Sequence, residues 1–155
     1  MSCTIRFAKA GDETVIAKLL EQIFNQHAQG RPDLFGGGKS KYTAEDVLKL
    51  FDNKDAPIFV AVDEGDSVLG YAFCVIKEFT SPAHYKTLYL DDLNVDAAVR
   101  RQGVATALVN ACRAYGKENG CYNLTLNVWA FNEGAMRFYE KNGFTPQRFI
   151  LEDLL

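Results

Sequence analysis

Residues 99–111 read VRRQGVATALVNA, and this stretch guides the interpretation of the whole chain. Arg100 and Arg101 lead into Gly103, after which apolar residues recur at helical spacing. A helix N-terminus carries unpaired N–H groups and a partial positive charge, so two arginines there are mildly unfavourable unless an anion binds. Gly103 leaves the backbone open to such a ligand. The stretch therefore predicts either an anion site, which would suit a phosphate, or an ordinary solvated helix start.

The segments around this helix alternate between strand-like and helix-like patterns. Strands are expected at residues 4–8, 56–63, 67–78, 87–95 and 123–128 and after Gly143, and helices at residues 12–27, 43–51, 103–119 and 132–141. Residues 30–41 are expected to form a glycine-rich loop, and Thr43 and Asp46 frame a capped helix start.

This order predicts an α/β fold and one domain over residues 1–155. The early hairpin implies antiparallel strands, and the late strand-helix-strand unit implies a parallel crossover. We therefore expect a mixed, mostly antiparallel twisted sheet of six to seven strands flanked by four helices.

Composition limits the class of protein. The chain has 155 residues, 48% of them hydrophobic and 24% charged, with a net charge of -3, so nucleic acid is not an expected partner. No apolar run is long enough to span a membrane, and the first residues do not resemble a secretory signal, so a cytoplasmic location is expected. The four cysteines lack C-x-x-C spacing and there are only two histidines, so no metal is expected and the thiols should be reduced.

The segment GGGKS at residues 36–40 resembles the end of a nucleotide-binding P-loop. That motif requires a glycine where Asp33 stands, and a strand before it, where FNQHAQGRPD is not strand-like. We interpret the segment as a loop.

Two motifs together carry a resemblance. The pattern R-x-x-G-x-A at Arg100, Gly103 and Ala105 follows a strand that ends in LNV, and residues 132–144 read NEGAMRFYEKNGF. These resemble the two signatures of the GCN5-related N-acetyltransferases (GNAT family), Q/R-x-x-G-x-G/A and N-x-x-A-x-x-F-Y-x-x-x-G-F. The resemblance covers residues 56–146 well and the N-terminal third by element order only. It implies the fold of that family.

The resemblance also implies acetyl-coenzyme A as cosubstrate. Its pyrophosphate would lie on the N–H groups of residues 101–106, and its pantetheine arm would pair with the backbone of residues 93–95 like an added strand. The residues implied in coenzyme binding are Leu93, Asn94, Val95, Arg100, Arg101, Gln102, Gly103, Val104, Ala105, Thr106, Asn132, Ala135, Phe138 and Tyr139. The residue pattern alone favours a core position for Phe138.

Acetyl transfer to an amine needs a base, because an alkylammonium has a pKa of about 10. By resemblance, Tyr139 is the general acid toward the coenzyme thiolate and an N–H near Val95 is the oxyanion donor. Asp91 and Asp92 interrupt the apolar strand LYLDDLNV, where buried carboxylates are costly, and successive strand residues face opposite sides. YLDDLNV resembles the polyamine acetyltransferase branch.

Asp91 is our choice of base, because it lies on the same side of the strand as Leu93 and Val95, beside the expected pantetheine path. Asp92 is its substitute or the partner of a cationic acceptor. The alternatives are structural: the two carboxylates could cap backbone groups or pair with a lysine, and Tyr139 could be a packing residue.

We therefore expect an N-acetyltransferase that acts on the primary amine of a small molecule or peptide. The acceptor side is expected to involve residues 27–35, Tyr42, Tyr85 and Trp129, with His27 and His84 more ordinary surface or structural residues. A homodimer could form through residues 149–155. The competing hypotheses are a non-catalytic coenzyme A-binding sensor or interaction module, and a plain anion- or nucleotide-binding domain.

Overall fold

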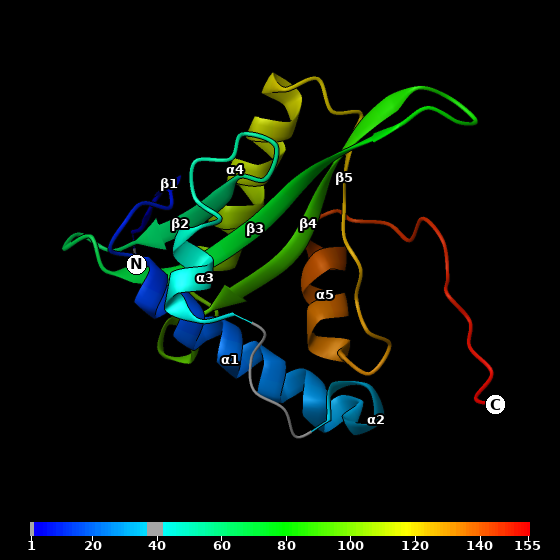
Figure 1. Ribbon diagram of the computed structural model, residues 1–155, viewed down its shortest axis with the longest axis horizontal. Coiled ribbons are helices and arrows are strands. Elements are labelled where there is room, and N and C mark those ends of the chain that lie inside the picture. Colours follow the sequence, from blue (N-terminus) through cyan, green and yellow to red (C-terminus); the bar gives the residue numbers. More distant parts are fainter. Residues whose placement is uncertain (1, 37–41) are drawn as a thin grey trace.

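A twisted five-stranded sheet runs through the centre of the computed structural model, which describes residues 2–36 and 42–155 (Figure 1). Its strands, in spatial and chain order, are β1 (Thr4–Phe7), β2 (Ile58–Val62), β3 (Val68–Phe79), β4 (Tyr85–Val95) and β5 (Asn123–Thr125). The first four pair antiparallel, and β4 pairs with β5 in parallel. The expected α/β fold, with its mixed, mostly antiparallel sheet and late parallel crossover, is confirmed.

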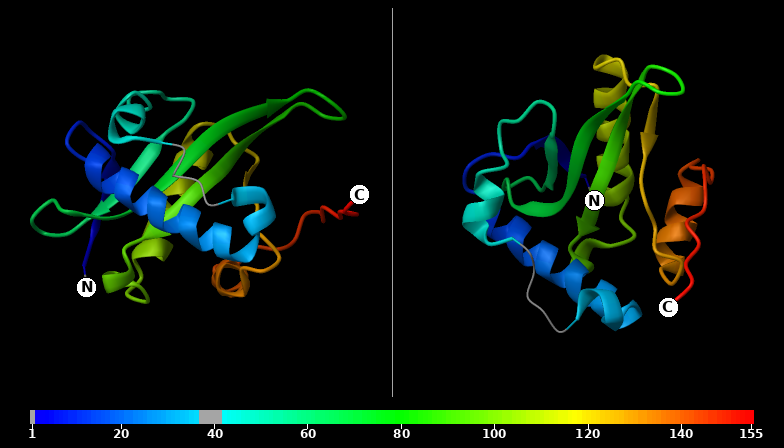
Figure 2. Two further views of the ribbon diagram at one scale, coloured as in Figure 1. Left: turned by 60° about the horizontal axis from the view of Figure 1, so that its bottom comes forward. Right: turned by 45° about the vertical axis from the view of Figure 1, so that its right-hand side comes forward.

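Helices cover both faces of this sheet (Figure 2). They are α1 (Glu13–Gly30), α2 (Pro32–Phe35), α3 (Ala44–Leu48), α4 (Val104–Glu118) and α5 (Glu133–Lys141), with a 3-10 turn, η1 (Ala97–Val99). The expected capping box at the start of α3 is present, because Thr43 Oγ1 accepts from the Asp46 N–H and Asp46 accepts from the Thr43 N–H.

Two hydrophobic cores lie on opposite faces of the sheet. One packs α4 residues such as Val104 and Leu108 against Leu88 and Leu90 of β4. The other packs α1 and α3 against Val60, Tyr71 and their neighbours on β2 and β3. The sheet therefore has a face toward α4 and a face toward α1.

The end of the chain differs from expectation. No strand follows Gly143 in the described residues, so the sheet has five strands and not six or seven. Gly143 ends α5 with a φ of +87°, and residues 149–155 form no strand (red in Figure 1). Their Glu152 pairs with Arg31, the residue that ends α1, at 2.5 Å. A β-rich sequence forms a strand only where a partner edge supplies hydrogen bonds.

The segment expected to be a loop over residues 30–41 is partly helical. The α1 helix continues to Gly30, and α2 starts with Pro32 at its first position, where the missing proline N–H costs nothing. Together with α2, the helices number five in the described ranges against the four expected. Residues 37–40 of the GGGKS segment lie outside the described residues.

A β-bulge in β4 positions the acidic pair. Phe73 of β3 pairs with Asp92, and Cys74 pairs with Leu90, so Asp91 is the extra residue. Because of this insertion, Leu93 and the preceding Leu90 both face the α4 core. Asp92 consequently faces the α1 side of the sheet.

Candidate active site

The start of α4 leaves its backbone donors available. Gly103 is its N-cap with a φ of +84°, and no side chain in the described part of the chain caps it. Nothing lies within 4 Å of where a Cβ on Gly103 would stand. Arg101 also adopts a left-handed conformation, with a φ of +63°, and both residues are exposed. The uncapped N–H groups of a helix with arginines beside it form an arrangement that suits an anion.

The remaining residues of this motif lie as follows. Gln102 is exposed, whereas Val104 is buried in the core below the helix start, so its backbone alone faces outward. Ala105 packs partly against the same core, and Thr106 is half-buried in the first turn. Arg100 is anchored, because its Nε donates to the Val95 carbonyl at 3.3 Å.

Beside this helix start, β4 and β5 separate. Their parallel pairing runs from Thr87 with Asn123 to Tyr89 with Thr125 and goes no further. Over residues 93–95, β4 is paired with β3 on one side and has no strand on the other within the described residues. The Asn94 side chain faces α1 and donates to the Leu19 carbonyl at 2.9 Å. A ligand along this edge would therefore meet backbone groups of Leu93, Asn94 and Val95.

The two carboxylates occupy different environments. Asp91 is exposed at the bulge, whereas Asp92 is half-buried. Burial raises the pKa of Asp92 to about 7, the interaction with Tyr71 opposes that shift, and the charge of Asp91 adds to it. A carboxyl with a pKa near neutrality can change its protonation state during a reaction at physiological pH.

Tyr139 lies on α5, whose start the sequence pattern predicted well. Asn132 caps this helix as expected, because its side-chain oxygen accepts from the Ala135 N–H at 3.1 Å. Phe138 and Tyr139 both pack against the α4-side core, with ring centroids 5.1 Å apart. Burial raises the pKa of Tyr139, and the negative charge of Asp92 raises it further. Tyr139 is therefore a protonated donor in the same electrostatic environment as Asp92.

Several residues expected on the acceptor side come together. His27 lies 5.3 Å from Phe35, and Phe35 lies 5.6 Å from Trp129, measured between ring centroids. These rings come from α1, α2 and the segment after β5, with Phe131 stacked on Trp129. Burial lowers the pKa of His27, so its ring is neutral at physiological pH.

Other expected residues lie elsewhere. Tyr85 stands seven positions before Asp92 on β4, about 23 Å away at the usual rise of a strand, and stacks on Phe79 in the projecting β3–β4 hairpin. His84 bonds to Glu78 in the same hairpin. Tyr42 packs partly against the α1-side core, and Asp33 is held by Arg31.

One residue near the carboxylates was not anticipated from the sequence. Tyr71 of β3 is fully buried on the α1 side and interacts electrostatically with Asp92. In the sequence it is one aromatic residue in an apolar strand, and nothing in that pattern distinguishes it from a core residue. Only the strand register places it beside the acidic pair.

No group of three or more His, Cys, Asp or Glu side chains in the described residues could hold a metal ion. None of the helices there has the length and apolar character needed to cross a membrane.

Comparison with known proteins places this geometry in a family. Residues 19–144 match the Acetyltransferase (GNAT) family. The uncharacterized N-acetyltransferase YhfO of Bacillus subtilis is 32% identical over 142 residues, which cover 90% of this chain and 88% of that protein. The peptidyl-lysine N-acetyltransferase YjaB of Escherichia coli is 35% identical over 100 residues, 64% of this chain and 56% of its own.

Solved structures agree in fold. A tetramutant of the BH1408 protein from Bacillus halodurans superposes with a TM-score of 0.90 and 27% identity, over 98% of this chain and 99% of that one. Glucosamine-6-phosphate N-acetyltransferase from Arabidopsis thaliana shares the fold, with a TM-score of 0.74 and 19% identity over 99% of each chain. The family match spans most of the chain, and its relatives are N-acetyltransferases. The chain therefore belongs to the GNAT family of acetyltransferases and is an N-acetyltransferase.

Proposed function

We propose that this protein transfers the acetyl group of acetyl-coenzyme A to a primary amine of a small molecule or peptide by direct attack on the thioester. The observation that carries the proposal is Asp92, a half-buried carboxyl with a pKa of about 7 beside the unpaired edge of β4. Relatives and structural neighbours named for peptidyl-lysine, aminoglycoside and glucosamine-6-phosphate acetylation support an amine acceptor in general.

The start of α4 fits the coenzyme pyrophosphate. The N–H groups of its first turn would hold the phosphate oxygens, and Gly103 leaves room for them. Arg101 and Gln102 are exposed beside this turn, and Arg100 is held there by its bond to the Val95 carbonyl. The unpaired edge of residues 93–95 would take the pantetheine arm as an added strand. Asn132, Ala135, Phe138 and Tyr139 would line the other side from α5.

The bound coenzyme supplies an acetyl thioester, and the chain supplies the proton transfers. Asp92 would accept a proton from the acceptor ammonium, which leaves a neutral amine able to attack. Tyr139 keeps its proton in its buried environment and would donate it to the departing thiolate. An N–H near Val95 would stabilise the developing oxyanion. Asp91, exposed at the bulge, would attract the cationic acceptor.

Asp92 replaces Asp91 as our choice of base for a physical reason. Burial raises the pKa of Asp92 toward neutrality, where a base works best, whereas Asp91 is exposed to solvent. The bulge at Asp91 gives Asp92 the inward position.

The test measures release of coenzyme thiol and the mass of the acetylated product across a panel of small amines and lysine peptides. We expect Tyr139→Phe and Asp92→Asn each to lower kcat/KM by about 100-fold or more. A Tyr115→Phe variant, changed at the other end of α4, serves as the matched control. Wild-type rates in both active-site variants would remove the assigned roles.

The alternative is a non-catalytic coenzyme A-binding module. Calorimetry distinguishes it, because Tyr139→Phe should retain coenzyme binding while losing turnover. A wild-type chain that binds acetyl-coenzyme A but acetylates none of the amines would favour the binding module.

We also propose a homodimer, in which residues 149–155 of each chain pair with the outer edge of β5 of the other. Phe149, Ile150 and Leu151 are 81%, 83% and 91% exposed, and apolar side chains at such exposure indicate a missing partner. β5 is the edge strand, and a 590 Å³ cavity runs along it beside α4. The cavity is lined by Arg113 and Lys117, and the tail carries Asp153 beside Glu152, which pairs with Arg31 of its own chain.

In a dimer with a two-fold axis, each chain would donate its residues 149–155 to the β5 edge of the other, so both β5 edges would gain a hydrogen-bonded partner. Light scattering of the full chain should give the mass of a dimer, and a chain shortened to residue 148 should give that of a monomer. A monomeric full chain, or a shortened chain that remains dimeric, would contradict the exchange.

We further propose a reducing compartment such as the cytoplasm. The supporting observation is the pair of free core thiols, Cys74 and Cys112, whose sulfur atoms lie 3.4 Å apart without a disulfide.

A further inference from the structure

The Tyr71 hydroxyl is unusual in the core of this protein. Tyr71 is 0% exposed, and its hydroxyl is the one buried side-chain nitrogen or oxygen in the described ranges without a hydrogen-bond partner. Buried hydroxyls are almost always paired, because an unpaired one loses its bonds to water without replacement. An exception of this kind calls for an explanation, and the environment of the side chain supplies one.

The strand register places this hydroxyl beside Asp92. Tyr71 pairs with Asn94, and Phe73 pairs with Asp92. Side chains two positions apart on a strand share a face, so Tyr71 and Asp92 are diagonal neighbours on the face toward α1, within reach of an aromatic side chain. After burial, the charge of Asp92 is the largest influence that raises the pKa of Tyr71.

Among the described residues, Tyr71 is the neutral hydroxyl that interacts with Asp92 on this face. The charged or titratable groups that act on Asp92, or feel its charge, are Tyr71 on β3, Asp91 on β4 and Tyr139 on α5. The residues that α1 buries against the sheet, Ile16, Leu19 and Leu20, are apolar. The Leu93 N–H, next to Asp92 in the chain, acts to lower the Asp92 pKa.

We propose that Tyr71 is a positioning residue of acetyl transfer, whose hydroxyl donates a hydrogen bond to the Asp92 carboxylate when that group acts as the base. This rests on the proposed function, in which Asp92 takes a proton from the acceptor ammonium. One proton moves from the ammonium nitrogen to a carboxylate oxygen, and Tyr71 keeps its own proton throughout, because burial raises its pKa. Catalytic hydrogen bonds of this kind are often loose in the ligand-free protein and tighten when the substrate binds.

The donated bond has a definite consequence. A hydrogen bond to the charged form of a carboxyl favours that form and lowers its pKa. Burial pushes the pKa of Asp92 upward, and Tyr71 holds it back to about 7. Without the hydroxyl, Asp92 would be protonated at neutral pH and unable to accept the proton of the amine.

The first experiment compares pH profiles of acetyl transfer for the wild type and Tyr71→Phe. The variant keeps the ring and its packing, so we expect it to fold, and urea unfolding checks this. The acidic limb of its profile should move to higher pH by about one unit, which lowers the rate at pH 7 about 5-fold and restores it near pH 9. A purely structural role would lower the rate equally at all pH values, and that result would overturn the proposal.

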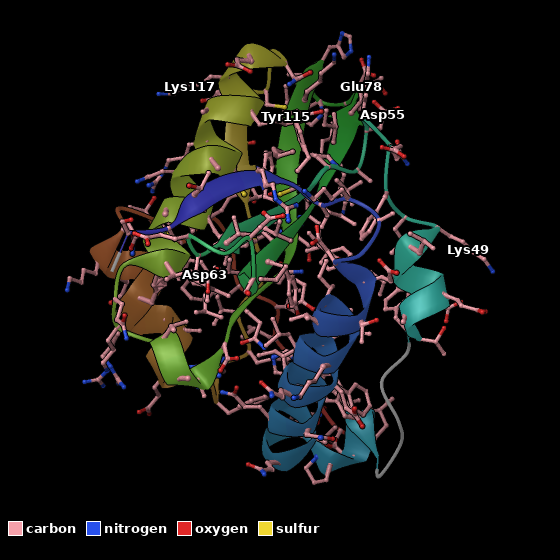
Figure 3. The ribbon with its side chains drawn as sticks, turned by 90° about the vertical axis from the view of Figure 1, so that its left-hand side faces the viewer. Lys49, Asp55, Asp63, Glu78, Tyr115 and Lys117 are labelled. Carbon is pink, nitrogen blue, oxygen red and sulfur yellow. The ribbon has the colours of Figure 1, made fainter. Side chains whose placement is uncertain are left out.

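The matched control is Tyr115→Phe. The Tyr115 hydroxyl donates to the Lys54 carbonyl at 2.6 Å, near the C-terminal end of α4, and Figure 3 shows Tyr115 with Lys117 and Asp55 at the end of the molecule away from α2. Its pH profile should match that of the wild type. A shift in this control equal to that of Tyr71→Phe would count against a specific role for Tyr71.

A second readout does not depend on activity. Carbon-13 NMR of aspartate-labelled protein without ligands follows the Asp92 carboxyl, assigned by its loss in Asp92→Asn. The Asp92 pKa should be about 7 in the wild type and higher in Tyr71→Phe. Equal values in the two proteins would overturn the inference. If the values differ but the wild type acetylates no amine, the Tyr71–Asp92 interaction stands and the proposed function fails.

Discussion

The two faces of β4 bury different kinds of residue. Toward α4, Leu88 and Leu90 join a core of apolar side chains and two thiols. Toward α1, Asp92 and Asn94 bring a carboxyl and an amide beneath a helix, next to the Tyr71 hydroxyl. Polar groups cost stability when they are buried, so their concentration on one face of one strand supports the proposed role of Asp92, whereas the apolar face toward α4 mainly holds the fold together.

The sharpest way to break this comparison is Asp92→Asn. We expect kcat/KM to fall by about 10²–10⁴-fold, because the variant cannot accept a proton. The free energy of unfolding, in contrast, should increase in this variant. The folded pKa of about 7 lies above that of the unfolded chain, so the ionised carboxylate destabilises the fold as pH rises toward 7. Urea unfolding should show the variant gaining stability relative to the wild type as the pH rises from about 4 to about 7, with the gain constant above that range.

The same experiment has a clear negative result. An Asp92→Asn variant that keeps wild-type activity would show that the polar face of β4 is structural. Asp63→Asn, in the β2–β3 turn, is a suitable control for the loss of one acidic group.

The opposite face is tested by Leu88→Ala. Leu88 is 0% exposed and packs against Gly116 of α4, so the cavity should lower the free energy of unfolding by about 3 kcal/mol. The pH dependence of the acetyl-transfer rate, measured on the folded protein, should keep the shape it has in the wild type. Denaturant unfolding and activity at low temperature check both points, and a displaced profile would show that the two faces are not independent.

An intermediate effect is expected for Asn94→Leu. The substitution removes the hydrogen bond from Asn94 to the Leu19 carbonyl, the buried link between β4 and α1, and should cost about 1–2 kcal/mol of stability. Unfolding midpoints in urea measure the loss. A variant as stable as the wild type would mean that packing alone holds α1 on this face.

The smallest effect is expected for Asp91→Asn. The charge of Asp91 raises the pKa of Asp92, so its removal should shift the acidic limb of the rate profile to lower pH by a fraction of a unit. The maximal rate should change little unless the acceptor carries several positive charges. A loss as large as that in Asp92→Asn would return the role of base to Asp91.

Local patterns allowed much of the fold to be predicted. The start of α4 after Gly103, the Asn132 cap of α5 and the Thr43 capping box all depend on residues within one helical turn. The strand order followed from alternation and short connections. The strand expected after Gly143 was wrong, because a strand also depends on an available partner edge, which no local pattern describes.

The candidate site was predictable only in part. Its helix starts and its acidic pair were visible, since each motif occupies a short stretch of chain. The orientation of the two carboxylates could not be predicted, because strict alternation takes no account of an extra residue in the strand. Tyr71 was missed for the same kind of reason, since its neighbour Asp92 lies 21 positions away.

The sequence by itself thus determined the family motifs, the helix boundaries at Gly103 and Asn132, and the presence of two carboxylates in an apolar strand. Only the tertiary structure decided that Asp91 is exposed, that Asp92 faces α1, and that a buried hydroxyl stands beside it. The physical reason is that helix caps form between near neighbours in the chain, whereas strand register, burial and the pKa values that follow from them arise between segments that meet only on folding.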